Sequence, residues 1–412
     1  MTQPPRNRRQ EAREHNLAQG LTTRVLRLRL KDKHAPLLRA EATRVNLVWN
    51  YVNALSAQVL LREGRFISSD ELHRFTAGAT REGLDLHSQT VQAVNEEFTT
   101  RRKQFKKARL RWRVSNRARS NYSLGWVPFK KSAISYRGGQ LFFRGQALSL
   151  WDSYGLAGYE LGAGSFSEDA RGRWYVNLTV KVRKKPLPAA AVSADALGID
   201  LGLKSHMTDS LGEAVQAQRF YRDLEPALVA AQRAGKKERV RALHAKVFNR
   251  RKDFLHKLST QQARDSAAIF VGDVNSKALA RTRMAKSVLD AGWSAYRTML
   301  SYKCDDAGVW FKQVDESYST QECHVCHART GPKGREELSV RRWVCSGCGA
   351  EHDRDVNAAL NIKARGLAWL EKEFSKAREA RAGEAVLNKS AGHSLSALAP
   401  GHGRPAGGIP FL

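Results

Sequence analysis

Two closely spaced cysteine pairs constrain the fold of this chain more than any other feature. The pairs are Cys323-His-Val-Cys326 and Cys345-Ser-Gly-Cys348, and eighteen residues separate them. Each C-x-x-C turn presents two thiolates to one metal, so this spacing predicts a tetrahedral, structural zinc site with four protein ligands. The segment between the pairs is expected to form the hairpin of a zinc ribbon.

A redox dithiol, or two unrelated pairs, is the alternative to a zinc site. The chain has only five cysteines, and a disulfide-built protein would have a different cysteine pattern. Cys304 is the odd cysteine. It lies in a stretch with helical character and is predicted to be a small buried residue.

The charge of the chain predicts a polyanionic partner. Seventy Lys and Arg face forty Asp and Glu, which gives a formal net charge of +30. Such a charge repels itself unless a polyanion neutralises it, and nucleic acid is the natural candidate. An anionic membrane surface is the weaker alternative. No apolar run approaches the ~20 residues that span a bilayer. The N-terminus lacks the apolar core of a secretory signal, so an intracellular protein is expected.

The three histidines near the cysteines are expected to lie at the surface or to contact nucleic acid. They are His324, His327 and His352. Four thiolates already fill a tetrahedral zinc shell, which leaves no position for an imidazole ligand.

The densest basic stretch, RRKQFKKARLRWR at 101–113, is predicted to bind nucleic acid. The pattern over 88–113 predicts a helix whose end is strongly basic. The candidate contacts are Arg101, Arg102, Lys103, Lys106, Lys107, Arg109, Arg111, Trp112 and Arg113. Arginines pair with phosphates, and an aromatic ring can stack on a base or pack inward. A solvated helix surface is the alternative, and residues 234–252 form a second basic candidate.

The first half of the chain reads as a β-rich module with inserted helices. Residues 21–31 alternate apolar and basic side chains as a strand does, and 36–62 repeat apolar residues at helical spacing. Ser69 or Asp70 is expected to cap another helix. Short strands over 122–183 are expected to pair with the strand at 21–31, and a linker is expected at 184–196.

From residue 197 onward, strands alternate with helices, which is typical of an α/β unit. Strands are predicted from 197, at 267–274 and at 309–319. Helices are predicted at 222–265, at 284–307 and from about 355. The chain after about 380 is small and polar and is expected to be disordered.

Two aspartates stand out in this α/β unit. Asp200 ends an apolar strand in LGIDLGLK, and Asp355 stands at a helix start, seven residues after the last cysteine. Either residue could be an ordinary turn or helix cap. An ionised Asp at a strand edge is costly unless it is paired or binds a cation. Cleavage of a phosphodiester by two metal ions needs several converging carboxylates, so a third is expected between these two positions.

The motifs of this unit, taken in order, resemble TnpB, the RNA-guided nuclease family of insertion sequences that is related to the small type V CRISPR effectors. They are GIDLGLK, AIFVGDVNSKAL, TRMAKSVLDAGWSAYRTMLSYK, ESYSTQECHVC, CSGCG and DRDVNAALNI. The resemblance covers roughly 197–366, with a match in outline over 21–190.

The resemblance implies a fold of α/β and β parts. The α/β part is an RNase H-like RuvC nuclease domain (197–320 and 351–380) with an inserted zinc ribbon (321–350). A β-barrel wedge module (21–34 and 120–190) and a helical recognition module (35–119) precede it. Disorder is expected at 1–20 and 381–412.

The resemblance also implies a function, which is RNA-guided cleavage of DNA with catalytic Mg²⁺ (or Mn²⁺) and a structural Zn²⁺. By motif, Asp200 matches the first RuvC aspartate and Asp355 the last. The implied partners are a guide RNA encoded near its own gene and target double-stranded DNA with a short flanking motif, without a membrane. The implied location is the prokaryotic cytoplasm, on the nucleoid when DNA is bound.

One motif departs from the family pattern. Members usually carry a Glu in a segment like V-E-D-L-N, whereas this chain has Val-Gly-Asp-Val-Asn at 271–275, so Gly272 stands at the Glu position. Asp273 is expected to point to the opposite face of the strand. Asp290 lies on a following helix, where a structural role is the alternative. Glu316 ends the next predicted strand and is therefore predicted to complete the metal site.

If no residue replaces the missing Glu, the alternative is a nuclease-inactive, RNA-guided DNA-binding protein. A CRISPR-associated TnpB-like effector is a further alternative, and a transposition accessory protein ranks last.

Overall fold

The computed structural model describes residues 20–188, 193–334 and 336–394. The chain divides into two compact units, Met1–Lys184 with Leu224–Val247, and Lys185–Asp223 with Phe248–Leu412. The disorder expected at 1–20 therefore falls almost wholly outside the described residues, as does part of the linker expected at 184–196. In the described part of the chain, no helix is both long and apolar enough to cross a membrane.

A four-stranded antiparallel sheet joins the N-terminal strand of the first unit to its β-rich middle. Its order is β1 (Leu21–Arg29), β7 (Trp174–Arg183), β6 (Leu161–Glu168) and β2 (Trp126–Phe129). A three-stranded sheet follows the order β3 (Ile134–Arg137), β4 (Gln140–Phe143) and β5 (Gln146–Ser149). The antiparallel register of β1 and β7, with Leu21 opposite Arg183, confirms the predicted pairing.

Three helices pack against this sheet in one hydrophobic core, namely α2 (Ala35–Glu63), α3 (Ser69–Phe75) and α4 (Ser88–Phe105). The cap of α3 is Ser68 and neither Ser69 nor Asp70, because Ser68 and Glu71 bond each other's backbone N–H groups in a capping box.

Helix α4 ends at Phe105, whereas the sequence predicts a helix to residue 113. Lys106 adopts the left-handed conformation, and the following chain runs along α2. There Asn53 bonds the backbone N–H and C=O of Leu110, and Asn50 bonds those of Arg113. These side chains satisfy the backbone that a helix would otherwise satisfy internally.

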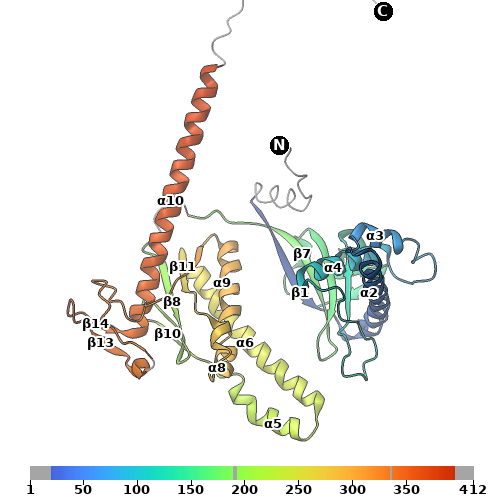
Figure 1. The fold of residues 1–412 in the computed structure, drawn as a ribbon, viewed down its shortest axis with the longest axis horizontal. Coiled ribbons are helices and arrows are strands. Elements are labelled where there is room, and N and C mark those ends of the chain that lie inside the picture. Colours follow the sequence, from blue (N-terminus) through green and yellow to red (C-terminus); the bar gives the residue numbers. More distant parts are fainter. Residues whose placement is uncertain (1–19, 189–192, 335, 395–412) are drawn as a thin grey trace, which may run out of the picture. The chain divides into compact units, whose positions relative to one another are not determined.

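A five-stranded sheet forms the centre of the second unit (Figure 1). Its order is β10 (Ala214–Gln216), β9 (Ser205–Asp209), β8 (Ala196–Leu201), β11 (Ala268–Gly272) and β12 (Trp310–Val314). Strand β9 pairs antiparallel with β8 and β10, and β11 pairs parallel with β8 and β12. The first three strands are thus a meander, and β11 and β12 are added by helical crossovers.

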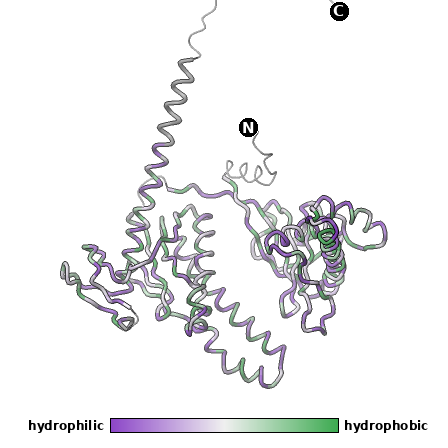
Figure 2. Tube along the Cα trace, in the orientation of Figure 1, coloured by the Kyte–Doolittle hydropathy of each residue, from purple (hydrophilic) through white to green (hydrophobic). Residues whose placement is uncertain are grey.

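Helices cover both faces of this sheet. On one face, Ile199 and Val271 pack with Leu255 of α6 (Lys237–Asp265) and Tyr296 of α9 (Trp293–Ala307). On the other face, Ala268 and Phe270 pack with α10 (Arg354–Ser394). Hydrophobic residues are accordingly frequent along the strands (Figure 2). The remaining helices are α5 (Glu225–Arg233), α7 (Ser276–Leu279) and α8 (Ala285–Ala291), and Gly292 separates α8 from α9.

Two glycines allow α10 to lie directly on the strands. A Cβ at Gly198 of β8 would overlap the carbonyl oxygen of Ala359, and a Cβ at Gly366 would overlap the ring of Phe270. Only glycine permits this close approach. Helix α10 continues to Ser394, whereas the sequence predicts disorder from 381. Its abundant Ala, Glu, Lys and Arg favour helix, and residues 395–412 lie outside the described chain.

The cysteine segment contains one short hairpin, β13 (Arg342–Val344) with β14 (Glu351–Asp353). This hairpin encloses the second cysteine pair, whereas the sequence predicts a hairpin between the pairs. The turn from Cys345 closes it, because the N–H of Cys345 bonds the C=O of Ala350 at 2.9 Å.

Candidate metal centres and nucleic-acid surface

The four paired cysteines converge in the second unit. Their sulfur atoms all lie within 4.8 Å of one another. Sγ of Cys323 is 3.7 Å from Sγ of Cys348, and Sγ of Cys326 is 3.6 Å from Sγ of Cys345. A tetrahedron with metal–sulfur bonds of about 2.3 Å has edges of about 3.8 Å. The cluster therefore fits one zinc ion.

The two C-x-x-C turns share one backbone pattern. The N–H of Cys323 bonds the C=O of Ala328, and the N–H of Cys345 bonds the C=O of Ala350, each at 2.9 Å. The residue before each of these alanines, His327 or Gly349, has a positive φ and is therefore in the left-handed conformation. Thr330 Oγ1 also donates to Cys345 Sγ, and this is the largest of several hydrogen bonds that together lower the pKa of that thiol to about 6. A lowered pKa favours the thiolate form that binds a metal.

The neighbouring histidines have three different environments. His352, expected at the surface, is buried, with Nε2 at 3.0 Å from Cys323 Sγ and its ring against Trp343. His324 uses its backbone N–H and its Nδ1 to bond Oδ1 of Asn357 on α10. His327 is exposed beside Glu322. The prediction of a surface position for His352 was wrong because the hairpin β13–β14 turns this side chain towards Cys323. The spacing of the cysteines does not reveal that contact.

Strand register places Gly272 next to Asp200. The parallel ladder of β8 and β11 ends with Ile199 opposite Val271, so the same register, continued by one residue, brings Asp200 beside Gly272. Side chains alternate along a strand, and Ala268 and Phe270 face α10. Asp200 and position 272 therefore share the face that α10 covers.

Glu316 fills the space that a side chain at position 272 would occupy. It lies two residues after Val314, which is the register partner of Gly272 on β12. A Cβ added to Gly272 would overlap Oε2 of Glu316 and lie 3.2 Å from its Cβ. The carboxylate thus reaches the expected position from another strand's end.

Burial and mutual repulsion raise the pKa values of these carboxyl groups. Burial, together with the charges of Glu316 and Asp355, raises the pKa of Asp200 to about 7. Burial, followed by the charge of Asp273, raises the pKa of Glu316 to about 7. A cluster of oxygen donors with excess negative charge suits a hard divalent cation such as Mg²⁺ or Mn²⁺.

Arg341, which the sequence reasoning missed, binds Asp355 from the cysteine segment. Its Nη1 lies 2.9 Å from both carboxylate oxygens, and the charges of Arg354 and Arg341 offset part of the rise in the pKa of Asp200. A cation at Asp355 would compete with this guanidinium. Arg341 precedes another arginine in a basic chain, so no local signal separates it from surface residues.

The other two candidate carboxylates have different partners. Asp273 accepts a 3.3 Å bond from the N–H of Glu316 through Oδ1. It also lines, with Glu316 and Arg297, a pocket of about 590 Å³. Asp290 is buried and binds Arg251 at 2.7 Å and the N–H of Tyr221. Asp290 therefore joins α8 to α6, which agrees with the structural role given above as the alternative for this residue.

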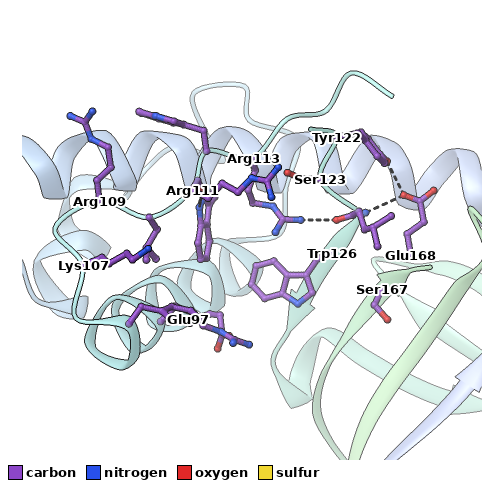
Figure 3. A pocket seen from close by; sticks show the side chains of 17 residues that line it. Glu97, Lys107, Arg109, Arg111, Arg113, Tyr122, Ser123, Trp126, Ser167 and Glu168 are labelled. Carbon is purple, nitrogen blue, oxygen red and sulfur yellow. Dashed lines mark hydrogen bonds and ion pairs between the residues drawn. The ribbon is translucent and has the colours of Figure 1, made fainter. Parts of the chain in front are cut away.

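The basic stretch lines a groove of about 920 Å³ in the first unit (Figure 3). Figure 3 shows Lys107, Arg109 and Arg111 on the chain segment that follows α4. These three side chains are exposed, and within the described residues none of them forms an ion pair with an acidic group. Trp112 is 43% exposed beside the guanidinium of Arg109. Exposed cations next to an exposed aromatic ring suit a nucleic-acid strand.

One arginine predicted for this surface is structural instead. Arg102 is buried and donates to Ser56 Oγ at 2.6 Å and to the carbonyl of Ile67 at 2.7 Å. That prediction was wrong because the inward face of α4 buries this guanidinium group. Arg113 is half-buried, with its guanidinium 6.0 Å from the ring centroid of Trp49 and 5.7 Å from that of Trp126, and it lines the groove, so its contact with nucleic acid stays a prediction. Arg101 is exposed and paired with Glu97, and Lys103 and Lys106 are exposed.

The chain resembles known RNA-guided nucleases in sequence. A family described as Cas12f1-like, TNB domain, matches residues 293–362, which include all four paired cysteines and Asp355. A protein of Streptomyces pristinaespiralis named as an RNA-guided DNA endonuclease is 35% identical over 295 residues, covering 68% of this chain and 69% of that protein. InsQ of Escherichia coli, named likewise, is 28% identical, and the match covers 48% of this chain and 55% of InsQ.

A solved structure, a Cas12f1–sgRNA–target DNA complex, aligns with 83% of this chain and 99% of its own, at 14% identity and a TM-score of 0.33. The 35% identity of the Streptomyces protein extends over two thirds of both chains. The chain therefore belongs to the TnpB family.

Proposed function

We propose that this protein is an RNA-guided DNA endonuclease, with a Mg²⁺- or Mn²⁺-dependent RuvC-like site formed by Asp200, Glu316 and Asp355. The observation that carries the proposal is the position of Glu316, whose carboxylate fills the space beside Gly272 and raises the pKa of Asp200. The relatives named as RNA-guided DNA endonucleases support the activity. The net charge of +30 supports nucleic acid as partner.

The domain assignment follows from the same proposal. The RuvC-like, RNase H-like nuclease domain comprises 197–320 and 351–380, and the zinc ribbon comprises 321–350. The β-barrel wedge module comprises 21–34 and 120–190, and the helical recognition module comprises 35–119. The mixed five-stranded sheet with helices on both faces supports the first assignment. The converging cysteines support the second.

Each proposed ligand comes from a different element. Asp200 stands at the end of β8, Glu316 in the loop after β12, and Asp355 in the first turn of α10. Bound cations would activate the attacking water and stabilise the leaving oxygen. Arg341 binds Asp355; a cation bound at Asp355 would replace this contact and would leave the guanidinium available for the negative charge of a phosphate.

The zinc ribbon has a structural part in this proposal, because it anchors the first turn of α10. The N–H of Arg354 bonds the carbonyl of Arg341 at 2.7 Å, and Asn357 bonds the backbone N–H of His324. Asp355 lies between these two contacts. Zinc in the cysteine cluster thus stabilises the segment that orients Asp355.

The proposed partners are a guide RNA encoded near the gene and duplex DNA with a short flanking motif. The groove with Lys107, Arg109 and Arg111 would contact phosphates, and Trp112 would stack on a base. Purification from cells that carry the native locus, followed by sequencing of bound RNA, identifies the guide.

Plasmid cleavage with the copurified guide, Mg²⁺ and a library of flanking motifs then tests the nuclease. Glu316→Gln should lower the single-turnover cleavage rate by about 10³-fold or more, since a metal ligand is lost. Asp315→Asn, which neutralises the adjacent exposed carboxylate, is the matched control and should cost less than about threefold. Cleavage that survives Glu316→Gln would exclude Glu316 and direct attention to Asp273.

A relocation variant sharpens this test. Gly272→Glu combined with Glu316→Gly moves the carboxylate to β11 while freeing the space that it needs. Partial recovery over Glu316→Gly alone would show that the site requires a carboxylate at that point in space.

A nuclease-inactive, RNA-guided DNA-binding protein is the second candidate, and Gly272 is the observation that favours it. In that case the wild-type protein would bind guide and target but leave the plasmid intact with both Mg²⁺ and Mn²⁺.

A further inference from the structure

One face of α10 holds the loop that carries Glu316. Asn357, Asn361 and Arg365 are spaced four residues apart, so they lie on the same side of the helix. All three donate hydrogen bonds to the segment 315–322. No other element supplies this many side-chain donors to the loop in the described part of the chain.

The two asparagines fix the far end of this loop. Nδ2 of Asn357 donates to the carbonyls of Ser319 (3.1 Å) and Glu322 (2.8 Å). Nδ2 of Asn361 donates to the same two carbonyls at 2.8 and 2.7 Å. Both asparagines are buried, so these contacts are shielded from water.

Arg365 binds the loop on both sides of Glu316. Its Nη1 donates to the carbonyl of Asp315 at 2.7 Å and to that of Ser317 at 2.9 Å. Its Nη2 lies 3.1 Å from Oε2 of Glu322, an ion pair that fixes the guanidinium plane. A planar guanidinium with several fixed donors can hold two carbonyls at once, which an ammonium group does less well.

The loop needs such a clamp because Glu316 is not on a strand. Strand β12 ends at Val314, so the ladder that would orient a residue of β11 or β12 does not reach Glu316. Asp273 adds a weaker contact, the 3.3 Å bond from the N–H of Glu316 to Oδ1 of Asp273. A displacement of about 1 Å in a catalytic group can lower a rate by about 10²-fold.

We propose that Arg365 is a positioning residue. By bonding the carbonyls on either side of Glu316, it fixes the orientation of this side chain, as strand pairing would do for a residue within a sheet. This inference rests on the proposed function, because it assumes that Glu316 is a metal ligand. Arg365 contacts the backbone of the loop and does not contact the metal or the DNA in this role.

The experiment compares Arg365→Ala and Arg365→Lys with Arg378→Ala in the full chain. Arg378 is an exposed arginine of the same helix with no ion pair among the described residues, so its removal controls for charge. Mn²⁺ binding is measured by electron paramagnetic resonance, and single-turnover cleavage is measured over a range of Mn²⁺ concentrations.

Arg365→Ala should weaken Mn²⁺ binding by about tenfold, raise the half-saturating Mn²⁺ concentration for cleavage to match, and lower the maximal rate by about 30-fold. Arg365→Lys should fall between Arg365→Ala and wild type, and Arg378→Ala should match wild type. Target DNA affinity should stay within about twofold in all three, a pattern that general destabilisation does not produce.

Three outcomes separate the inference from the proposal beneath it. If Glu316→Gln still cuts, the proposed metal site fails. If Glu316→Gln is inactive but Arg365→Ala has the Mn²⁺ dependence of Arg378→Ala, the positioning inference fails alone. If Arg365→Ala does not fold, Arg365→Lys decides, and wild-type Mn²⁺ dependence in that variant overturns the inference.

Discussion

The cysteine cluster and the carboxylate cluster lie in the same unit but are built in opposite ways. The cysteines come from two short turns with the same backbone hydrogen bonds. The carboxylates come from the end of β8, the loop after β12 and the start of α10. Four sulfurs converge because of local spacing, whereas strand register and helix packing bring Glu316 and Asp355 close enough for their charges to raise the pKa of Asp200.

This difference explains why one cluster follows its motif while the other departs from it. A C-x-x-C turn has no substitute elsewhere, since both thiolates depend on one backbone conformation. A carboxylate site needs an oxygen at a point in space, and more than one backbone position can supply it. Glu316 beside Gly272 is such a second position, because their strands are neighbours in register.

Loss of one zinc ligand tests the local cluster and should have the largest effect. Structural zinc contributes about 10–16 kcal/mol of binding free energy in small zinc domains. Cys345→Ser should therefore abolish zinc binding and cleavage, while the first unit keeps its circular dichroism signal. The readouts are zinc content by atomic absorption and plasmid cleavage. Cys304→Ser, outside the cluster, should retain zinc, and full zinc in Cys345→Ser would contradict the assignment.

Gly272→Ala tests the register-built cluster and should have the next largest effect. The added Cβ overlaps Oε2 of Glu316 and must displace it. We expect single-turnover cleavage to fall by about 100-fold while the fold persists. Gly158→Ala is the control, because a Cβ there meets nothing within 4 Å. Undiminished cleavage by Gly272→Ala would show that Glu316 need not occupy this space.

Arg102→Ala extends the comparison to a stretch that looks uniform in sequence but is divided by the fold. Its guanidinium bonds Ser56 and the carbonyl of Ile67 in the core. We expect the free energy of unfolding to fall by about 2 kcal/mol, because buried partners lose their donors. Urea denaturation measures this. An unchanged free energy of unfolding in Arg102→Ala would show that Arg102 is not structural and would restore it as a candidate contact for nucleic acid.

His206 of β9 contributes a part of the stability that is lost in acid. His206 is buried, and burial lowers its pKa to about 4. The unfolded chain, with a pKa near 6.5, therefore binds this proton first, so the contribution of His206 falls as the pH drops from about 6.5 towards 4. The raised pKa values of Asp200 and Glu316 act in the opposite direction, because the folded chain binds their protons first. We therefore expect the wild type to lose about 1.4 kcal/mol relative to His206→Phe between pH 7.5 and 5.5. Urea denaturation of both proteins, with zinc content monitored, measures this difference.

Arg111→Ala should have the smallest effect and complements Arg102→Ala. Arg111 is exposed, so we expect unchanged stability and about fivefold weaker binding of a single-stranded oligonucleotide. The slope of log affinity against log salt should decrease by about 0.7. Fluorescence anisotropy at several salt concentrations measures both quantities. A flat salt profile in the wild type would argue against a phosphate-dominated surface.

The sequence was most informative where the relevant physics is local. The cysteine spacing predicted four converging thiolates, and the apolar alternation over 21–31 predicted β1. It was less informative where burial decides. The basic run over 101–113 does not show that Asn50 and Asn53 hold its second half extended along α2, or that Arg102 points inward.

By itself the sequence determined the cysteine turns, the high positive charge and the family, because each depends on residues a few positions apart or on composition. Only the tertiary structure decided that Glu316 lies beside Gly272 and that Arg341 binds Asp355. The same holds for Arg365, which bonds the backbone of the loop that carries Glu316. Those contacts join residues from separate elements. They arise from strand register and from α10 lying on two glycines, and no pattern within a single element encodes them.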